Sequence, residues 1–319
     1  MPKYPVKLSI VIPFSNAERT LERTLKSILF ADSAGVDFEV IGINDGSTDK
    51  SSEIFGNYER RDERLTLVHC PNRGPGYARN RGIVESHGEY LFFIDADDEL
   101  TKNFFAVLYM HLCSRDIDML LFSQEIILNE REPLEPAAID YYLRRTTWVQ
   151  CAPTAKMLPQ LVSVGGCSVQ VSGYVTSREL WSENALWFPE FYYEDEVPFL
   201  MLLWYSRRST CISDQLVRHH VTAGSITRRD VSKRHIEGVL ANASEFSRMR
   251  ASFAKSEKTY AGLFQRYCDR RVIILMSKYF DLCRSNRIKV SRKSLINILK
   301  KNLLRRRVYK LYYREMRKV

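Results

Sequence analysis

Three carboxylates, Asp95, Asp97 and Asp98, follow an apolar run at residues 90–94 and are the clearest candidates for chemistry in this chain. An apolar run of that length bounded by charge is typical of a strand buried on both faces. Open α/β sheets bind ligands outside the carboxyl ends of their strands, and clustered carboxylates there favour Mg²⁺ or Mn²⁺ bridging to substrate phosphates. The segment predicts a metal–phosphate site, with a solvated loop and an Asp helix cap as the open alternative.

A second acidic pair, Glu194 and Asp195, follows an aromatic-rich stretch at residues 188–193. A carboxylate within hydrogen-bond reach of a hydroxyl can act as a general base, and aromatic faces suit packing against sugar rings. The alternative is that Asp195 caps a helix beginning near Val197. Spacing alone leaves both interpretations open.

Alternating apolar runs and amphipathic stretches predict the elements that position these acids. We expect strands at 7–13, 38–43, 65–69 and 90–94, with helices at 21–29, 51–58 and 77–86 between them. Strand–helix–strand spacing of this kind implies right-handed crossovers and an α/β fold with a mostly parallel sheet flanked by helices. Residues 1–98 then form a nucleotide-binding half, and the strand ends at 13–16, 44–47 and 95–97 face one crevice.

Asp45, at the end of the second expected strand, is the candidate for accepting hydrogen bonds from a base or ribose. Its alternative is an Asx turn that satisfies only local backbone. The loop at 74–76 does not fit the dinucleotide fingerprint G-x-G-x-x-G, because Arg79 stands at its last position, so we interpret it as a turn.

The second half of the chain is less regular. Apolar runs predict strands at 119–122 and 125–128, a polar loop at 130–136, a tight turn at 165–167, a buried helix at 197–205 and helices beyond residue 235. We therefore expect one domain at 1–230, with residues 99–230 as its acceptor half, and a helical, basic C-terminal region at 231–319.

Composition restricts the class of protein and its location. The 319 residues are 45% hydrophobic, carry a net charge of +10 and include seven scattered cysteines without a C-x-x-C pair, so neither a disulfide framework nor a zinc site is expected. No apolar run approaches the ~20 residues of a membrane-spanning helix, and no secretory signal is visible. We expect a cytoplasmic protein.

The positive charge is concentrated at the C-terminus. Residues 288–319 contain twelve Lys and Arg and one acid, Glu315, whereas the rest of the chain is close to neutral. An apolar stripe amid this charge predicts an interfacial helix on an anionic membrane surface, with a solvated basic helix packed on the body as the alternative. Nucleic-acid binding is not expected, because no RNA-binding signature accompanies the charge.

Four motifs occur in order, at residues 12–16, 44–49, 78–83 and 88–98. Together they resemble family 2 glycosyltransferases of the GT-A fold, densely over residues 6–110 and more thinly to about residue 227. The resemblance implies a nucleotide-sugar donor, usually a UDP-sugar, and a divalent cation, Mn²⁺ or Mg²⁺. By it Asp45 would contact the nucleobase, Asp95 the ribose or metal, and Asp97 the metal. The implied donor-site residues are Pro13, Ser15, Glu18, Asp45, Arg73, Asp95 and Ala96.

The resemblance also assigns roles outside the donor half. It implies that Glu194 and Asp195 are the catalytic pair, with Asp195 as the base, and that His219 is a metal ligand. His220 is the fallback, because neighbours on an extended chain point to opposite sides, and a packed or surface histidine is the alternative to both. Ser15 stands where the family often has Tyr, and Asn44 stands where it often has Asp.

The expected activity is a single in-line displacement with inversion. A hexose or N-acetylhexosamine would pass from a UDP-sugar to a glycan or lipid-linked saccharide acceptor in bacterial lipopolysaccharide or capsule synthesis. The enzyme would lie at the inner face of the cytoplasmic membrane. The rivals are a non-catalytic nucleotide-sugar or nucleic-acid binding protein on the same fold and a retaining transferase.

Overall fold

The computed structural model describes residues 6–113, 117–128, 170–221, 232–286 and 288. The chain divides into two compact units, one of residues 1–190 and 198–225 and the other of residues 191–197 and 226–319. The expected loop at 130–136, the turn at 165–167 and the basic segment 289–319 lie outside the described residues.

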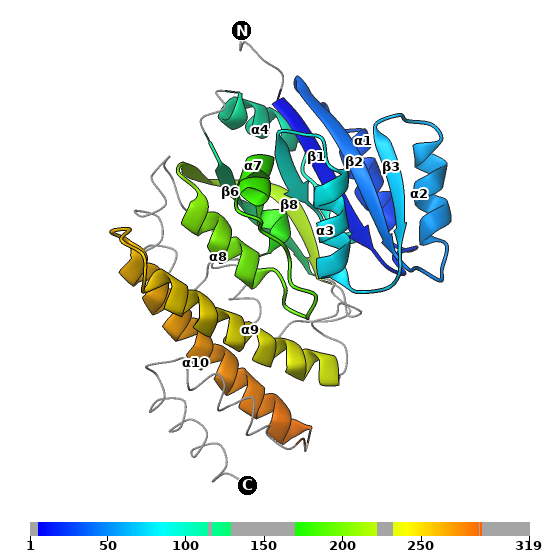
Figure 1. Ribbon diagram of the computed structural model, residues 1–319. Coiled ribbons are helices and arrows are strands. Elements are labelled where there is room, and N and C mark those ends of the chain that lie inside the picture. The colour runs from blue at the N-terminus through cyan, green and yellow to red at the C-terminus, as the bar shows by residue number, and fades with distance from the viewer. Residues whose placement is uncertain (1–5, 114–116, 129–169, 222–231, 287, 289–319) are drawn as a thin grey trace. The chain divides into compact units, whose positions relative to one another are not determined.

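The N-terminal half of the first unit has the expected alternation of strands and helices (Figure 1). Strand β1 is Val6–Phe14, β2 is Val36–Asp45, β3 is Leu65–Cys70 and β4 is Tyr90–Phe93. Helices α1 (Leu21–Leu29), α2 (Ser51–Glu59) and α3 (Pro75–Glu85) connect them. The four strands pair in parallel in the order β3-β2-β1-β4, so their carboxyl ends meet at one edge.

The sheet continues beyond β4 with mixed pairing. The added elements are β5 (Glu99–Leu100), α4 (Phe104–Leu112), β6 (Met119–Leu128), a 3₁₀ turn η1 (Val171–Gly173), β7 (Tyr174–Ser177), α7 (Arg178–Glu183), α8 (Glu196–Tyr205) and β8 (Ser209–Val221). Among the described residues, the strand order is β3-β2-β1-β4-β7-β6-β8-β5. One irregular strand, β6, replaces the two predicted at 119–128, and β5, β7 and β8 were not predicted.

Packing on the two faces of β1 explains how the sheet is covered. Its residues Leu8, Ile10 and Ile12 belong to the core cluster that includes apolar residues of α1 and α4. On the other face, a Cβ placed on Gly82 of α3 would lie 2.2 Å from a methyl group of Val11, so only glycine allows this approach. Figure 1 accordingly shows α3 in front of the sheet and α1 behind it.

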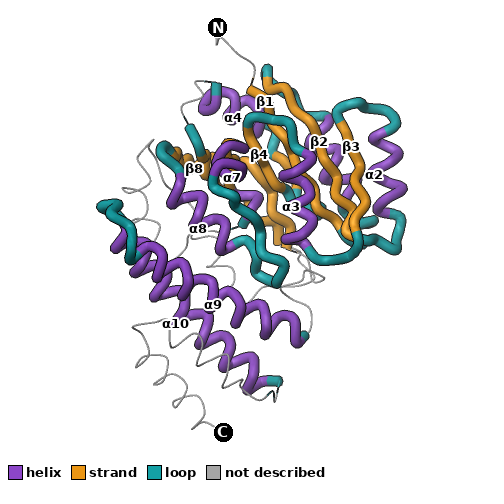
Figure 2. The backbone as a smooth tube through the Cα atoms, in the orientation of Figure 1, coloured by secondary structure: helices purple, strands orange, loops and turns teal. Residues whose placement is uncertain are grey.

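The second unit contains a helical hairpin. Helix α9 is Lys233–Phe253 and α10 is Ala261–Ser285, and Figure 2 shows them side by side. Ring contacts between Phe246 and Tyr267 and between Phe253 and Phe264 join the two helices. No helix in the described part of the chain has the length and apolar character to cross a bilayer.

Candidate active site

Asp45 ends β2 and organises the loop that follows β3. Asp45 is 5% exposed, and its carboxylate accepts hydrogen bonds from the backbone N–H groups of Arg73 at 2.8 Å and Gly74 at 2.9 Å. Asn72 donates from Nδ2 to the Asp45 carbonyl at 3.0 Å and to the Ser15 hydroxyl at 3.2 Å. Gly74 has φ +99°, a conformation that favours glycine, immediately before α3 begins. Each carboxylate oxygen of Asp45 already accepts one backbone N–H group. The predicted contact between Asp45 and a nucleobase stays a prediction.

The loops after β1 and β2 are joined to each other by hydrogen bonds. Asn16 Oδ1 accepts the N–H of Thr48 at 2.8 Å, and the N–H of Asn16 donates to Ser47 Oγ at 3.1 Å. The Glu18 carboxylate accepts the N–H of Lys50 at 3.2 Å, just before α2 begins. Pro13 is buried within β1. These contacts fix the edge where the donor was predicted to bind, although the individual roles of Pro13 and Glu18 stay predictions.

Beyond β4, Asp95 forms an ion pair with Arg79 of α3. The Arg79 Nη2 atom lies 2.9 Å from Asp95 Oδ1, and the side chain of Arg79 is 6% exposed against 37% for Asp95. Ala96, the next residue, is buried. Because Gly82 lets α3 approach the sheet closely, a buried arginine on this helix reaches the end of β4. One cation therefore already compensates part of the negative charge at this edge.

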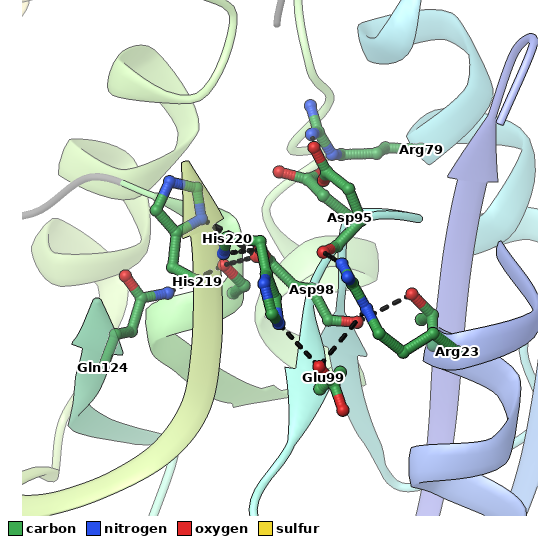
Figure 3. Close-up of polar contacts among 11 residues, drawn as sticks. Arg23, Arg79, Asp95, Asp98, Glu99, Gln124, His219 and His220 are labelled. Carbon is green, nitrogen blue, oxygen red and sulfur yellow. Dashed lines mark hydrogen bonds and ion pairs between the residues drawn. The ribbon is translucent and has the colours of Figure 1, made fainter. Parts of the chain in front are cut away.

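Asp98 is fully buried and forms the centre of a hydrogen-bond cluster (Figure 3). His219 donates from Nδ1 to Asp98 Oδ1 at 3.0 Å, and the N–H of His220 donates to the same oxygen at 3.2 Å. Ser172 donates to the other oxygen at 3.3 Å and itself accepts from Gln124 at 2.8 Å. Asp98 thus fixes the ring of His219 from the side away from solvent.

The two adjacent histidines point to different partners, as the strand geometry requires. Strands β5 and β8 are antiparallel, with Glu99 opposite Arg218, and this register brings Asp98 and Glu99 against His219 and His220. His220 Nε2 lies 2.6 Å from Glu99 Oε1, which Arg23 also contacts at 3.2 Å (Figure 3). His219 therefore lies with the strand-end carboxylates, and His220 belongs to a separate ion-pair cluster.

Charge around His219 favours its protonated form. Burial of the ring opposes protonation, but the carboxylate of Asp98 outweighs burial and raises the pKa of His219. Asp95 and Asp97 raise this pKa further. The three carboxylates therefore lie within electrostatic range of the imidazole. The sequence predicted a site for Asp97 and His219 together, and it named Asp98 only as a member of the carboxylate cluster.

The segment before α8 is attached to α3 by both backbone and side-chain contacts. The side chain of Asn80 accepts the N–H of Phe188 and donates to its carbonyl, both at 2.8 Å. Arg73 forms an ion pair with Glu190 at 2.5 Å, and its guanidinium lies 4.1 Å from the Tyr77 ring centroid. Arg73, predicted to bind the donor, thus links the loop after β3 to the segment that leads to Glu194.

Glu194 and Asp195 belong to the second compact unit, on the segment 191–197. Glu194 is 7% exposed and Asp195 is partly exposed, immediately before α8. Asp45, Asp95, Asp97 and His219 belong to the first unit. That Asp195 lies beside a bound donor stays a prediction.

Comparison with known proteins shows which family the N-terminal part of the chain resembles. Residues 9–155 match the family model described as "Glycosyl transferase family 2". Over this part, a little under half of its length, the chain is similar to glycosyltransferase family 2. A Bacillus subtilis protein named "Uncharacterized glycosyltransferase EpsJ" is 38% identical over 98 residues, which are 31% of this chain and 28% of that protein. A Haemophilus influenzae "Uncharacterized glycosyltransferase" is 29% identical over 209 residues, 65% of this chain and 76% of that protein.

The fold comparison agrees with the topology. The crystal structure of Staphylococcus aureus TarS residues 1–349 in complex with UDP-GlcNAc superposes with a TM-score of 0.65 at 18% identity, over 93% of this chain and 79% of that one. This likeness confirms the predicted α/β GT-A fold. The chain is matched to the first curated relatives over about a third of their own length or less.

The donor set of this candidate site fits a divalent cation. In the described part of the chain no three His, Cys, Asp or Glu side chains gather closely enough to hold a metal by themselves. Mg²⁺ at nucleotide sites typically uses one or two carboxylates and takes further ligands from phosphates and water. Asp97 and His219 can supply such a partial set, and a carboxylate on the other ring nitrogen, as Asp98 is here, commonly orients a ligating imidazole.

Sequence reasoning named Asp98 among the clustered carboxylates but did not predict its burial or its contact with His219, and it gave Arg79 no role in the site. Asp98 directly follows the predicted ligand Asp97, but its burial depends on β8, a strand that was not predicted. The spacing of Arg79 from two glycines could have indicated that it faces the sheet. Arg79 lies three residues from both Gly76 and Gly82, on the helix face whose small residues let α3 approach the sheet.

Proposed function

We propose that this chain is an inverting, metal-dependent glycosyltransferase. It would transfer a hexose or N-acetylhexosamine from a UDP-sugar to a glycan or lipid-linked saccharide of bacterial surface polysaccharides. The observation that carries the proposal is that Asp45, Asp95 and Asp97 lie at or directly after the carboxyl ends of the parallel strands β2 and β4, with His219 within electrostatic range of Asp95 and Asp97. This edge belongs to a part of the chain that matches family 2 and has the GT-A fold. TarS, of the same fold, has been crystallised with UDP-GlcNAc, which supports a UDP-sugar donor.

Donor binding is assigned to the loops that follow β1, β2 and β4. Asp45 and the loop it orders would receive the nucleobase and ribose, while Ser15, Arg73 and Ala96 line the same edge. Asp97 and His219 would hold Mn²⁺ or Mg²⁺, which when bound neutralises charge on the diphosphate leaving group. Arg79 orients the Asp95 carboxylate before the donor arrives.

Chemistry in this proposal needs a base and no protein nucleophile. Asp195 accepts the proton of the acceptor hydroxyl as that oxygen attacks the anomeric carbon, and the bond to the diphosphate breaks in the same step. One displacement inverts the anomeric configuration. Glu194, buried beside Asp195, supports its orientation.

Location and acceptor belong to the proposal as well. The basic composition of residues 289–319, twelve Lys and Arg with one acid, supports contact with an anionic membrane surface at the inner face of the cytoplasmic membrane. A lipid-linked saccharide acceptor would be presented at such a surface.

A donor panel tests the proposal. We would measure release of UDP from UDP-glucose, UDP-galactose, UDP-GlcNAc and UDP-GalNAc with Mn²⁺, with and without EDTA. Release from one sugar that EDTA abolishes is the expected result. Asp97→Ala should lose this release, whereas Asp37→Ala, which removes an exposed carboxylate at the start of β2, should retain it.

The binding-protein alternative predicts a different outcome of the same experiment. A binder would retain UDP affinity but release no UDP from any sugar, with or without an acceptor mixture. Absence of both UDP release and UDP binding would contradict the UDP assignment itself.

A further inference from the structure

Residues 191–195, which carry the predicted catalytic pair Glu194 and Asp195, form no helix or strand. A segment without the backbone hydrogen bonds of a helix or strand must be held by other contacts if a base on it is to stay in position. In the second unit, residues of α9 and α10 contact the segment on both sides of Glu194 and Asp195.

Helix α9 holds the segment on its N-terminal side. Asn242 is fully buried and donates from Nδ2 to the carbonyl of Tyr193 at 2.8 Å and to that of Tyr192 at 3.4 Å. One turn earlier, a Cβ added to Gly238 would lie 2.7 Å from the Tyr192 carbonyl oxygen. The His235 ring lies 4.8 Å from the Tyr192 ring, measured between centroids. One face of α9 therefore contacts the backbone directly before Glu194.

Helix α10 holds the segment on its C-terminal side. The Arg271 guanidinium contacts the Glu196 carboxylate through Nε at 3.1 Å and through Nη2 at 2.5 Å. This fork geometry fixes direction as well as distance. Glu196 directly follows Asp195 and begins α8, so Arg271 fixes the residue next to the predicted base.

Lys278, also on α10, contacts the same segment. Its Nζ is 4.0 Å from the Tyr193 ring centroid. Burial lowers the pKa of Lys278, while the carboxylates of Glu196 and Asp195 oppose that shift and Arg271 adds to it. The ammonium group and Asp195 are thus within electrostatic range of each other.

The backbone of Tyr193 shows that these contacts impose a particular conformation. Its φ is +65°, a left-handed conformation that is uncommon for residues other than glycine. Such conformations persist where surrounding contacts hold them, and they occur often at active sites. The carbonyl that Asn242 holds belongs to this residue.

We propose that the α9–α10 hairpin positions the catalytic base, with Gly238, Asn242 and Arg271 as its positioning residues. The inference rests on the proposed function, in which Asp195 removes the acceptor proton. It gives the C-terminal helices a role in turnover that is separate from any contact of residues 289–319 with a membrane.

A pair of glycine substitutions in the full-length protein tests this role. Gly238→Ala inserts a methyl group where the Tyr192 carbonyl lies, and should lower kcat about 10- to 100-fold through displacement of the base while UDP affinity is unchanged. Gly262→Ala is the matched control, because its nearest neighbour would be the flexible end of Arg266 at 3.6 Å. Alanine favours a helix over glycine, so a loss of helix stability would not explain a lower kcat in Gly238→Ala.

Three substitutions on α10 keep the test decisive if Gly238→Ala does not fold. Arg271→Gln should lower kcat with UDP affinity unchanged, Arg271→Lys should restore part of it, and Arg266→Gln on the exposed face of α10 should have no effect. Amide hydrogen exchange at residues 192–196 should be faster in Gly238→Ala than in Gly262→Ala. Unchanged kcat in both Gly238→Ala and Arg271→Gln, or a parallel loss of kcat and UDP affinity, would overturn the inference.

Failure of the proposed function would give a different pattern. A wild-type protein that transfers no sugar to any acceptor, whatever the exchange rates, would contradict the assignment of Asp195 as a base and with it the inference. An active wild type with fully active Gly238→Ala and Arg271→Gln would contradict the inference alone.

Discussion

The donor edge and the segment 191–197 carry carboxylates that are held in different ways. At the donor edge the acids follow strands whose register is fixed by the sheet, and their partners include backbone N–H groups, as at Asp45. The base segment has side-chain contacts from α9 and α10, as at Asn242 and Arg271. Strand register is set by backbone hydrogen bonds and tolerates the loss of one side chain, whereas a segment held by side-chain contacts loses part of its support. The two regions should therefore respond differently to substitution.

The largest effect at the donor edge is expected for Asp45→Asn. The side-chain amide of the variant would place its NH₂ group opposite the backbone N–H of Arg73 or Gly74. A buried donor left without an acceptor costs about 1–3 kcal/mol. We expect the KM for the donor to rise about 10- to 100-fold, with kcat at saturating donor retained. Steady-state kinetics with varied donor measure both.

The matched control for Asp45→Asn is Asp37→Asn, an exposed acid at the other end of the same strand. Equal changes in KM for the two variants would mean that a general loss of negative charge, rather than the ordered loop at 72–74, is responsible. A selective fall in kcat for Asp45→Asn would contradict its assignment to donor binding.

A smaller effect is expected for Asp98→Asn, which retains the shape of the buried side chain but removes the charge beside His219. Loss of such an orienting carboxylate typically weakens metal binding by about 10- to 100-fold. The Mn²⁺ concentration for half-maximal activity should rise within this range, and activity should recover at high Mn²⁺. Direct titration of Mn²⁺ binding in the presence of UDP gives a readout without turnover, and unchanged affinity would exclude His219 as a ligand.

The smallest effect is expected for a carboxylate far from the donor edge, Glu39. It accepts hydrogen bonds from Ser9 Oγ at 2.6 Å and from the N–H of His87 at 2.6 Å. Burial opposes ionisation of Glu39, but these hydrogen bonds outweigh it and lower its pKa. Glu39→Gln should reduce the free energy of unfolding by about 1 kcal/mol at pH 7 and leave the donor KM and kcat unchanged.

The pH dependence of that loss follows from the lowered pKa. A carboxylate with a lowered pKa in the folded state stabilises the protein above its unfolded pKa, and this contribution is lost as the pH falls through the folded value. The difference between wild type and Glu39→Gln should therefore be largest near neutral pH and disappear below about pH 4. Denaturant melts at several pH values measure it, and a difference that grows with acidity would contradict the account.

The sequence predicted the parallel half of the sheet, because apolar strands alternate there with amphipathic helices in register. The strand ends followed directly, so Asp45, Asp95 and Asp97 could be assigned together. β5, β7 and β8 could not be predicted, since their pairing joins residues far apart in the chain, such as Glu99 and Arg218. For the same reason the contact of Asp98 with His219 could not be predicted, and the contacts of Asn242 and Arg271 with residues 192–196 carried no local signal.

The most direct test of the account compares turnover with donor binding in Asp195→Asn. If donor binding belongs to the strand ends and proton removal to the segment held by α9 and α10, kcat should fall at least about 100-fold while UDP affinity stays at the wild-type value. Transfer rates and UDP titration calorimetry on the same preparation decide this. Full turnover in Asp195→Asn, or a joint loss of turnover and UDP affinity, would contradict the assignment of these two tasks to two regions.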